Sequence, residues 1–138
     1  MYSMHQMHFL VQKHLEHVLL QHKSLSFSQF MILVGFTCSS DASVSQSCIA
    51  DRLNLTEATV SRHISSLVEL GLLSRSEDKK NRRKHVISIT EKGKKTFASA
   101  SLIIDKELVN IFSSIQVKDR EAIMKIFSTV LSKIPTKK

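Results

Sequence analysis

The segment SEDKKNRRKHVISIT, residues 76–90, has the residue types that point most directly to a chemical role. Residues 75–95 contain nine Lys or Arg and three Asp or Glu, so this stretch carries +6 of the chain's formal net charge of +8. Cations gathered in one segment are typical of a surface that attracts DNA or another polyanion. Charge runs are commonly solvated faces, so the neighbouring elements must decide between the two interpretations.

A helix is expected over residues 56–70, directly before the basic segment. Thr56 is a suitable N-cap, and Val60, Ile64 and Leu67 fall together on an inward face. The opposite face is small and polar, which allows close approach to the major groove of DNA, where an arginine can bond guanine. The residues of this outer face are Ala58, Thr59, Ser61, Arg62, Ser65 and Ser66.

Three helices are expected before this one. Apolar residues recur at three- and four-residue steps from Met4 to Leu19, as in an amphipathic helix. Ser26 and Gln29 can form a capping box for a second helix, and Ser45 can cap a short third helix. The second helix is expected to bury Phe27, Phe30, Met31 and Val34, and the third to bury Ile49 and Leu53.

A hairpin and two helices are expected after it. LLSRSE and HVISIT read as strands that flank the basic loop, and helices follow after Thr90 and before Pro135. The predicted fold is mainly α with a small β-hairpin wing, a winged helix-turn-helix. Flanking helices with unpartnered apolar stripes indicate a symmetric dimer. The stripe of the fifth helix is expected to include Phe97, Ile104, Leu108, Ile111, Phe112 and Ile115.

Residues 44–95 closely resemble the winged helix-turn-helix of the MarR family of bacterial and archaeal transcription regulators. The pieces that carry the resemblance are IADRLNL, TVSRHISSLVELGLLSR, NRRKHVISIT and ITEKG. The resemblance extends over the whole chain and implies one MarR-like domain at 1–138. Its dimerisation helices would lie at 1–24 and 96–138, around a DNA-binding lobe at 25–95. The implied function is a homodimeric, sequence-specific regulator, most simply a repressor.

The resemblance also implies roles for individual residues. Thr59, Ser61 and Arg62 would face bases or phosphates, and Arg83 would enter the minor groove from the wing. A pseudo-palindromic operator with half-sites about one helical turn apart would fit such a dimer. Asn81 stands where the family usually has an aspartate, so Arg83 lacks a charge-assisted brace. Further DNA-facing residues would be Thr56, Ala58, Ser65, Ser66, Lys79, Lys80, Arg82 and Lys84.

Family members commonly bind a small anionic or aromatic effector beside the DNA-reading lobe. The candidate lining residues here are Phe9, His14, Phe30 and Val34, with an ordinary core role as the favoured alternative.

Two other kinds of sensing are open. His5 with His8, and His14 with His17, have a spacing that permits a metal site with Glu16 nearby, but spacing alone does not predict one. Polar surface or interface positions are favoured for these histidines, and no metal or cofactor is expected. Cys38 and Cys48 are either reactive thiols or, as favoured, inert core residues.

The sequence argues against one other class of protein, an enzyme, and leaves a second as the alternative to a regulator. The sequence shows no glycine-rich phosphate loop, clustered acid pair or nucleophile-base grouping, so an enzyme is not expected. A winged-helix module that binds nucleic acid nonspecifically, or that contacts proteins, is the alternative. Because no run of about 18 apolar residues exists, no membrane contact is expected and the protein is placed in the cytoplasm.

Overall fold

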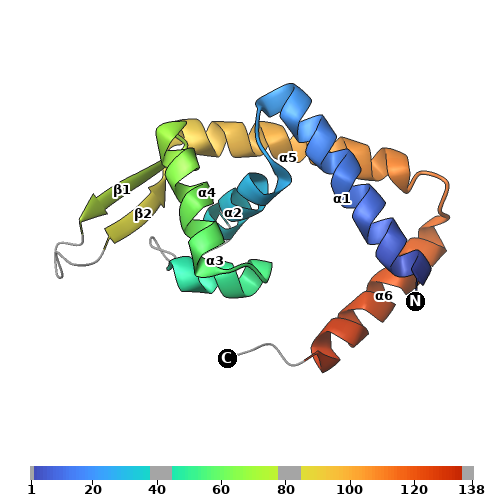
Figure 1. Cartoon of the computed structure of the whole chain (residues 1–138). Coiled ribbons are helices and arrows are strands. Elements are labelled where there is room, and N and C mark those ends of the chain that lie inside the picture. The colour runs from blue at the N-terminus through green and yellow to red at the C-terminus, as the bar shows by residue number, and fades with distance from the viewer. Residues whose placement is uncertain (1, 38–44, 78–84, 135–138) are drawn as a thin grey trace. The chain divides into compact units, whose positions relative to one another are not determined.

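The computed structural model describes residues 2–37, 45–77 and 85–134 of the 138-residue chain (Figure 1). Contacts divide the chain into two compact units, Met1–Ile104 and Asp105–Lys138, which are described separately. The described elements confirm the predicted winged helix-turn-helix. They are α1 (Tyr2–Lys23), α2 (Phe27–Thr37), α3 (Gln46–Leu53), α4 (Glu57–Glu69), β1 (Leu73–Glu77), β2 (His85–Ile89), α5 (Glu91–Ile111) and α6 (Val117–Lys133).

Helix α2 begins with the predicted capping box and lies at the centre of the first unit. The Gln29 backbone N–H donates to Ser26 Oγ over 3.1 Å, and the Ser26 N–H donates to Gln29 Oε1 over 2.9 Å. The predicted buried face of α2 was only partly right, because burial is not confined to one side of the helix. Helix α2 is contacted by α1, α3, α4 and β2, which leave it little free surface. The buried residues are Phe30, Ile32, Leu33 and Phe36, whereas Phe27, Met31 and Val34 are half-buried.

Helices α3 and α4 form the helix-turn-helix. Ser45 Oγ accepts the Cys48 N–H, as predicted, and Asn54 ends α3 in the left-handed conformation with φ 52°. Thr56 then caps α4. The predicted inward residues of α4 are fully buried and join a core shared with α2, α3 and the hairpin. This core contains Leu25, Ile32, Leu33, Phe36, Ile49, Ala50, Val60, Ile64, Leu67, Leu72, Leu73 and Ile87.

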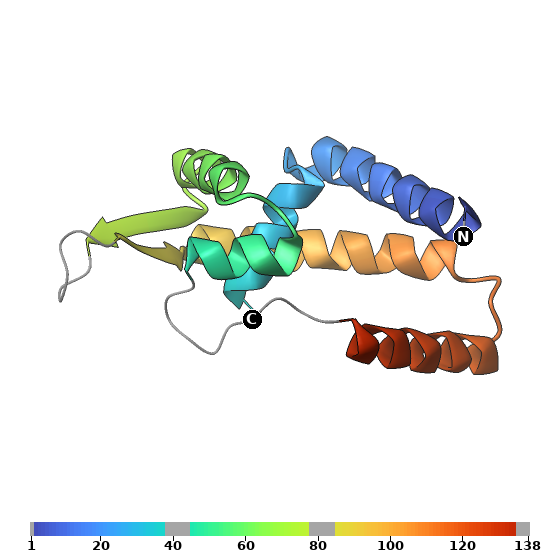
Figure 2. The ribbon, with the colours of Figure 1, turned by 60° about the horizontal axis from the view of Figure 1, so that its bottom comes forward.

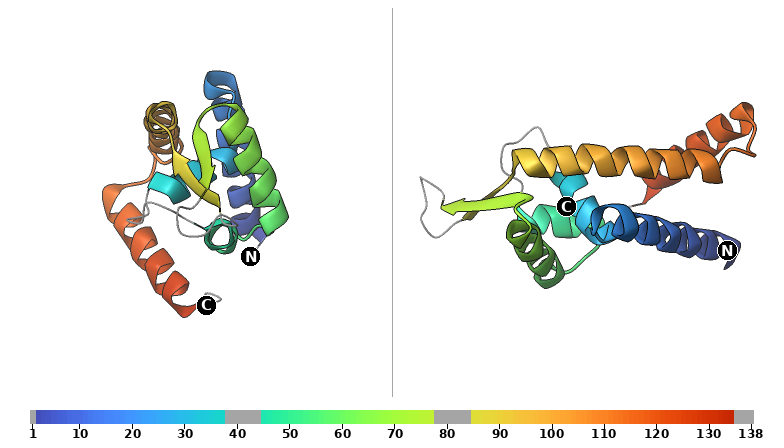
Figure 3. Two further views of the ribbon diagram at one scale, coloured as in Figure 1. Left: turned by 90° about the vertical axis from the view of Figure 1, so that its left-hand side faces the viewer. Right: turned by 90° about the horizontal axis from the view of Figure 1, so that it is seen from above.

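Strands β1 and β2 form an antiparallel hairpin that projects beyond α4 and the first turns of α5 (Figures 2 and 3). Thr90 joins the base of this hairpin to both neighbouring helices. Its hydroxyl donates to the Gly71 carbonyl over 2.8 Å and accepts the Gly93 N–H over 2.9 Å. Gly71 itself has φ +71°, as expected for a residue that ends a helix. The end of α4 and the start of α5 are therefore held together.

The second unit contains the end of α5, a turn and α6. Extending α5 through Phe112 and Ile115 was wrong, because α5 ends at Ile111. Ser113 donates its hydroxyl to the Asn110 carbonyl over 2.8 Å, an alternative to helical backbone bonding that favours a turn. None of the α6 residues is buried.

No helix among the described residues is long and apolar enough to cross a membrane.

Candidate nucleic-acid interface

The outer face of α4 presents the small polar side chains that the sequence predicted. Ala58, Arg62 and Ser65 are exposed, and Thr59 and Ser61 are half-buried at its edges. This face lies opposite the fully buried Val60, Ile64 and Leu67, so α4 is anchored on one side and open on the other. Short side chains on an open helix face allow the backbone to approach a duplex closely.

A chain of hydroxyl contacts leads from the N-cap of α4 to Arg62. Thr56 Oγ1 accepts the Thr59 N–H over 3.2 Å, and the two threonine hydroxyl oxygens are 2.9 Å apart. The Arg62 guanidinium donates to Thr59 Oγ1 over 3.4 Å. This last bond is long and exposed, so it orients Arg62 only weakly and leaves the guanidinium available to a base or phosphate.

Replacing Thr56 with alanine is expected to lower the free energy of unfolding by about 1 kcal/mol, because α4 loses its N-cap acceptor. Thr56→Ser keeps the hydroxyl and is expected to retain most of that stability. Urea denaturation of the two variants and the wild type measures the difference. Equal losses in both variants would show that the methyl group of Thr56, and not the cap, is what matters.

Ser66 differs from the other predicted residues of this face. It is half-buried, and its hydroxyl oxygen accepts a hydrogen bond from Gln29 Nε2 over 3.0 Å. Its predicted contact with DNA therefore competes with a bond to α2.

The basic hairpin is described only in part. The predicted wing residues Lys79, Lys80, Arg82, Arg83 and Lys84, together with Asn81, lie outside the described residues. The role of the wing tip therefore stays a prediction.

Two of the described cations near the hairpin have structural partners. Lys92 Nζ donates to the Leu70 carbonyl at the end of α4 over 2.7 Å. Lys94 forms an exposed ion pair with Glu91, also at 2.7 Å. Both lysines therefore have partners within the first unit before any ligand binds.

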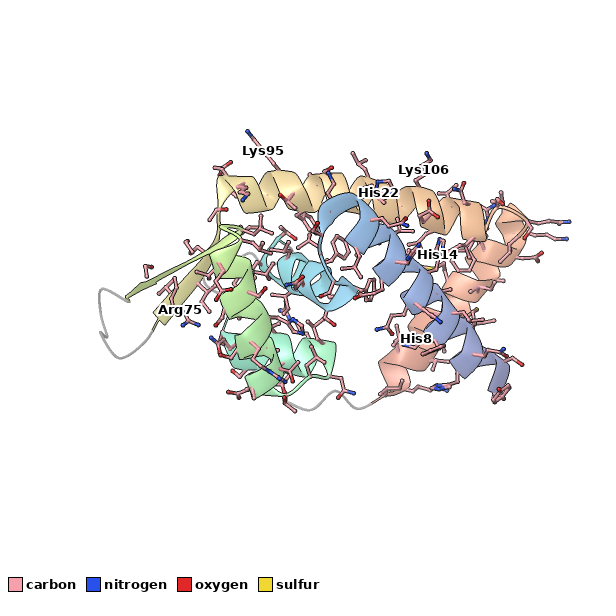
Figure 4. All side chains as sticks on the ribbon, turned by 45° about the horizontal axis from the view of Figure 1, so that its top comes forward. His8, His14, His22, Arg75, Lys95 and Lys106 are labelled. Carbon is pink, nitrogen blue, oxygen red and sulfur yellow. The ribbon has the colours of Figure 1, made fainter. Side chains whose placement is uncertain are left out.

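Two further cations near the hairpin are exposed, and from the sequence they were counted only in the charge of the segment. Arg75 is exposed on β1, and Lys95 extends outward from α5 (Figure 4). Arg75 is paired with Ile87 across the hairpin, so it shares the hairpin face of the core residue Leu73. The alternation of Leu73, Ser74 and Arg75 would have indicated this placement from the sequence.

The four candidate effector residues lie in different environments. Phe9 is exposed and lines a shallow hollow with Gln12, Lys13, Glu16 and Ser28. His14 is exposed on α1, and Val34 is half-buried in α2. Phe30 is buried and stacks on Phe97 of α5 with ring centroids 5.6 Å apart, so its role in the core is clear.

In the described part of the chain, the candidate histidines and the described cysteine do not come together as a metal or thiol site. No group of three His, Cys, Asp or Glu side chains there is placed to hold a metal ion. Glu16, proposed as a carboxylate beside the histidines, accepts the Phe27 N–H at the start of α2 instead. Cys48 is half-buried near the start of α3, and Cys38 lies outside the described residues.

The helix-turn-helix, the open polar face of α4 and the adjoining hairpin define a winged-helix protein. In agreement, a family model described as "Winged helix DNA-binding domain" matches residues 28–93. No curated protein matches the chain in sequence.

Solved structures of transcription regulators share the fold over nearly the whole chain. The regulator BldR from Sulfolobus solfataricus aligns with TM-score 0.83 and 22% identity over 96% of this chain and 92% of its own. A MarR family regulator from Rhodococcus sp. RHA1 aligns with TM-score 0.81 and 20% identity over 94% and 89%. MepR of S. aureus, in a complex with DNA, aligns with TM-score 0.82 and 21% identity over 96% of each chain. The chain therefore shares the fold of these regulators, and the fold implied by the resemblance in its sequence is confirmed.

Proposed function

We propose that this protein is a sequence-specific DNA-binding transcription regulator, acting as a homodimeric repressor. The observation that carries the proposal is the exposed, weakly tethered Arg62 on the open face of α4, beside a hairpin whose loop holds five Lys or Arg. Helix α4 would enter the major groove and the wing would lie along the backbone, with Arg83 in the minor groove. The other proposed DNA contacts are Thr56, Ala58, Thr59, Ser61, Ser65, Lys79, Lys80, Arg82 and Lys84, to which Arg75 and Lys95 are added. Ser66 is not among them, because its hydroxyl oxygen accepts a hydrogen bond from Gln29.

Fluorescence anisotropy tests this proposal. The full chain is titrated against a duplex from beside its own gene and against a shuffled duplex, at about 0.15 M salt to screen nonspecific attraction. Tighter binding to the native duplex is expected. Equal binding to both duplexes would favour the alternative function, a winged helix that binds nucleic acid without sequence preference or that contacts proteins.

The homodimer is supported by apolar side chains that the single chain leaves exposed. Phe127 is 43% exposed and Leu131 is 66% exposed, although both lie on a helix rich in apolar residues. Exposed apolar area of this kind marks a protein interface. Other exposed apolar residues of α1, α5 and α6 are Met4, Met7, Phe9, Leu102, Val109, Met124, Ile126 and Val130.

Sedimentation of the protein is expected to give about twice the chain mass of 15.6 kDa. Phe127→Asp should weaken the dimer roughly tenfold or more, because a carboxylate would lose water in an apolar interface. Lys118→Asp serves as the matched control, since it changes charge on the polar side of the same helix. A wild-type mass of one chain at micromolar concentration would contradict the dimer.

A surface hollow of about 280 Å³ is the proposed site for a small effector. It lies among α1, α2, α3 and the turn after α3, and combines aromatic and cationic side chains. Phe27 offers a ring face, and the exposed Arg52 offers charge to an anion. The remaining lining residues are His8, Gln12, Ser28, Met31, Leu53 and Leu55.

A thermal-shift comparison with benzoate and with toluene tests the charge preference of this hollow. Stabilisation by benzoate that is lost in Arg52→Gln would support an anionic effector. Equal effects of benzoate on the wild type and on Arg52→Gln would remove Arg52 from the site.

An enzymatic activity is not proposed. The role as a DNA-binding regulator also places the protein with the chromosome, in the cytoplasm.

A further inference from the structure

Gln29 connects the first turn of α2 to α4 through both ends of its side-chain amide. Its Oε1 accepts the Ser26 N–H over 2.9 Å, and its Nε2 donates to Ser66 Oγ over 3.0 Å. The orientation of the amide is determined, because a backbone N–H can be met only by the amide oxygen. The NH2 group must then face Ser66. Both bonds are partly shielded from water, which strengthens them.

The first turn of α2 is also attached to α1. The Phe27 N–H, one residue after Ser26, donates to the Glu16 carboxylate of α1. An anionic group at a helix N-terminus interacts favourably with the free amides and the helix dipole. The turn that holds Gln29 is therefore fixed by α1 on one side and bonds α4 on the other.

Apolar contacts alone would fix the rotation of α4 about its own axis less firmly than apolar contacts together with the Gln29–Ser66 hydrogen bond. Helix α4 is held in the core by the buried side chains of Val60, Ile64 and Leu67. Apolar packing, however, has little directional preference compared with a hydrogen bond. Ser66 lies four residues after Arg62 and seven after Thr59, on the same side of the helix. A rotation of about 20° would move a side-chain tip about 6 Å from the helix axis by about 2 Å, enough to break a base contact.

We propose that Gln29 is a positioning residue that fixes the rotation of α4 through Ser66 and so keeps Arg62 aimed at its base. This inference rests on the proposed function as a sequence-specific regulator. In this role Ser66 acts as an internal anchor of α4 and Gln29 itself does not touch DNA.

The effect on recognition is measured as the ratio of affinities for the native and shuffled duplexes. Gln29→Met removes both amide bonds and is expected to lower this ratio roughly fivefold, the equivalent of one hydrogen bond. Ser26→Ala is the matched control, because it weakens the same capping box but keeps the N–H that orients Gln29. It should leave the ratio within about twofold.

Gln29→Glu is the rescue variant, because its carboxylate can accept both the Ser26 N–H and the Ser66 O–H. The ratio should remain near that of the wild type. If Gln29→Met keeps the wild-type ratio, or Ser26→Ala lowers it equally, the positioning role is overturned.

A measurement without DNA tests the bond itself. The denaturation midpoint of the double variant Gln29→Met with Ser66→Ala is expected to equal that of Gln29→Met, because the second change removes no further bond. If Ser66→Ala lowers the midpoint by the same amount in Gln29→Met as it does in the wild type, the inference is overturned. A wild-type chain that does not distinguish the two duplexes would refute the proposed function, and the midpoints would then decide on the bond alone.

Discussion

Replacing Gly93 with alanine is expected to lower the free energy of unfolding by about 3 kcal/mol and the Tm by about 10 °C. A Cβ at this position would lie 2.1 Å from the Leu72 carbonyl oxygen and 2.8 Å from Ile89 Cγ1. The carbonyl cannot move aside freely, because it accepts the Thr90 backbone N–H over 3.0 Å. A flexible side chain could move aside, but the obstacle here is the backbone of Leu72, so the start of α5 would have to separate from the segment that leads into β1.

The matched control for this prediction is Gly35→Ala in α2. A Cβ there would meet only Ile49 Cγ1 at 3.6 Å, which is an ordinary van der Waals contact. Since alanine restricts the unfolded chain more than glycine does, the free energy of unfolding is expected to rise by about 0.5 kcal/mol. Urea denaturation curves measure both variants. A loss of less than 1 kcal/mol in Gly93→Ala would contradict the close approach of α5 to the Leu72 carbonyl.

The parts of the fold that the sequence predicted well are set by contacts within a few residues. The capping box of Ser26 and Gln29 and the caps at Ser45 and Thr56 each involve a side chain and an amide three residues away. The inward face of α4 follows from helical periodicity alone. Such features depend little on the rest of the chain, and for this reason local rules were sufficient.

Features that depend on tertiary packing were predicted less well. The burial of α2 on almost every side requires knowing that four other elements contact it, and this cannot be read from its own pattern. The bond between Gln29 and Ser66 joins residues 37 positions apart, so the pattern of α4 alone could not show that Ser66 contacts α2. The burial of Phe30 was predicted, but its stacking on Phe97 of α5 joins residues too far apart in the sequence for a local pattern to show.

Replacing Arg62 with alanine is expected to weaken binding to the native duplex by about tenfold to a hundredfold, with much less effect on a shuffled duplex. Arg62 is exposed on the outer face of α4, and the hydrogen bond that it donates to Thr59 is long. A base can therefore capture the guanidinium at little cost in structure. Competition anisotropy at fixed salt measures the two affinities, and the unfolding midpoint should change little because Arg62 is exposed.

Lys80→Ala provides the comparison that separates base reading from attraction to phosphate. This loop lysine is expected to bind the backbone, so its loss should weaken native and shuffled duplexes alike and reduce the salt slope by about one. Arg62→Ala should instead change the ratio of the two affinities more than it changes the slope. Equal losses on both duplexes for Arg62→Ala would assign it to the phosphate backbone. Sequence reading by α4 would then have to come from Thr59, Ser61 and Ser65, whose short side chains can reach only the nearest base edges.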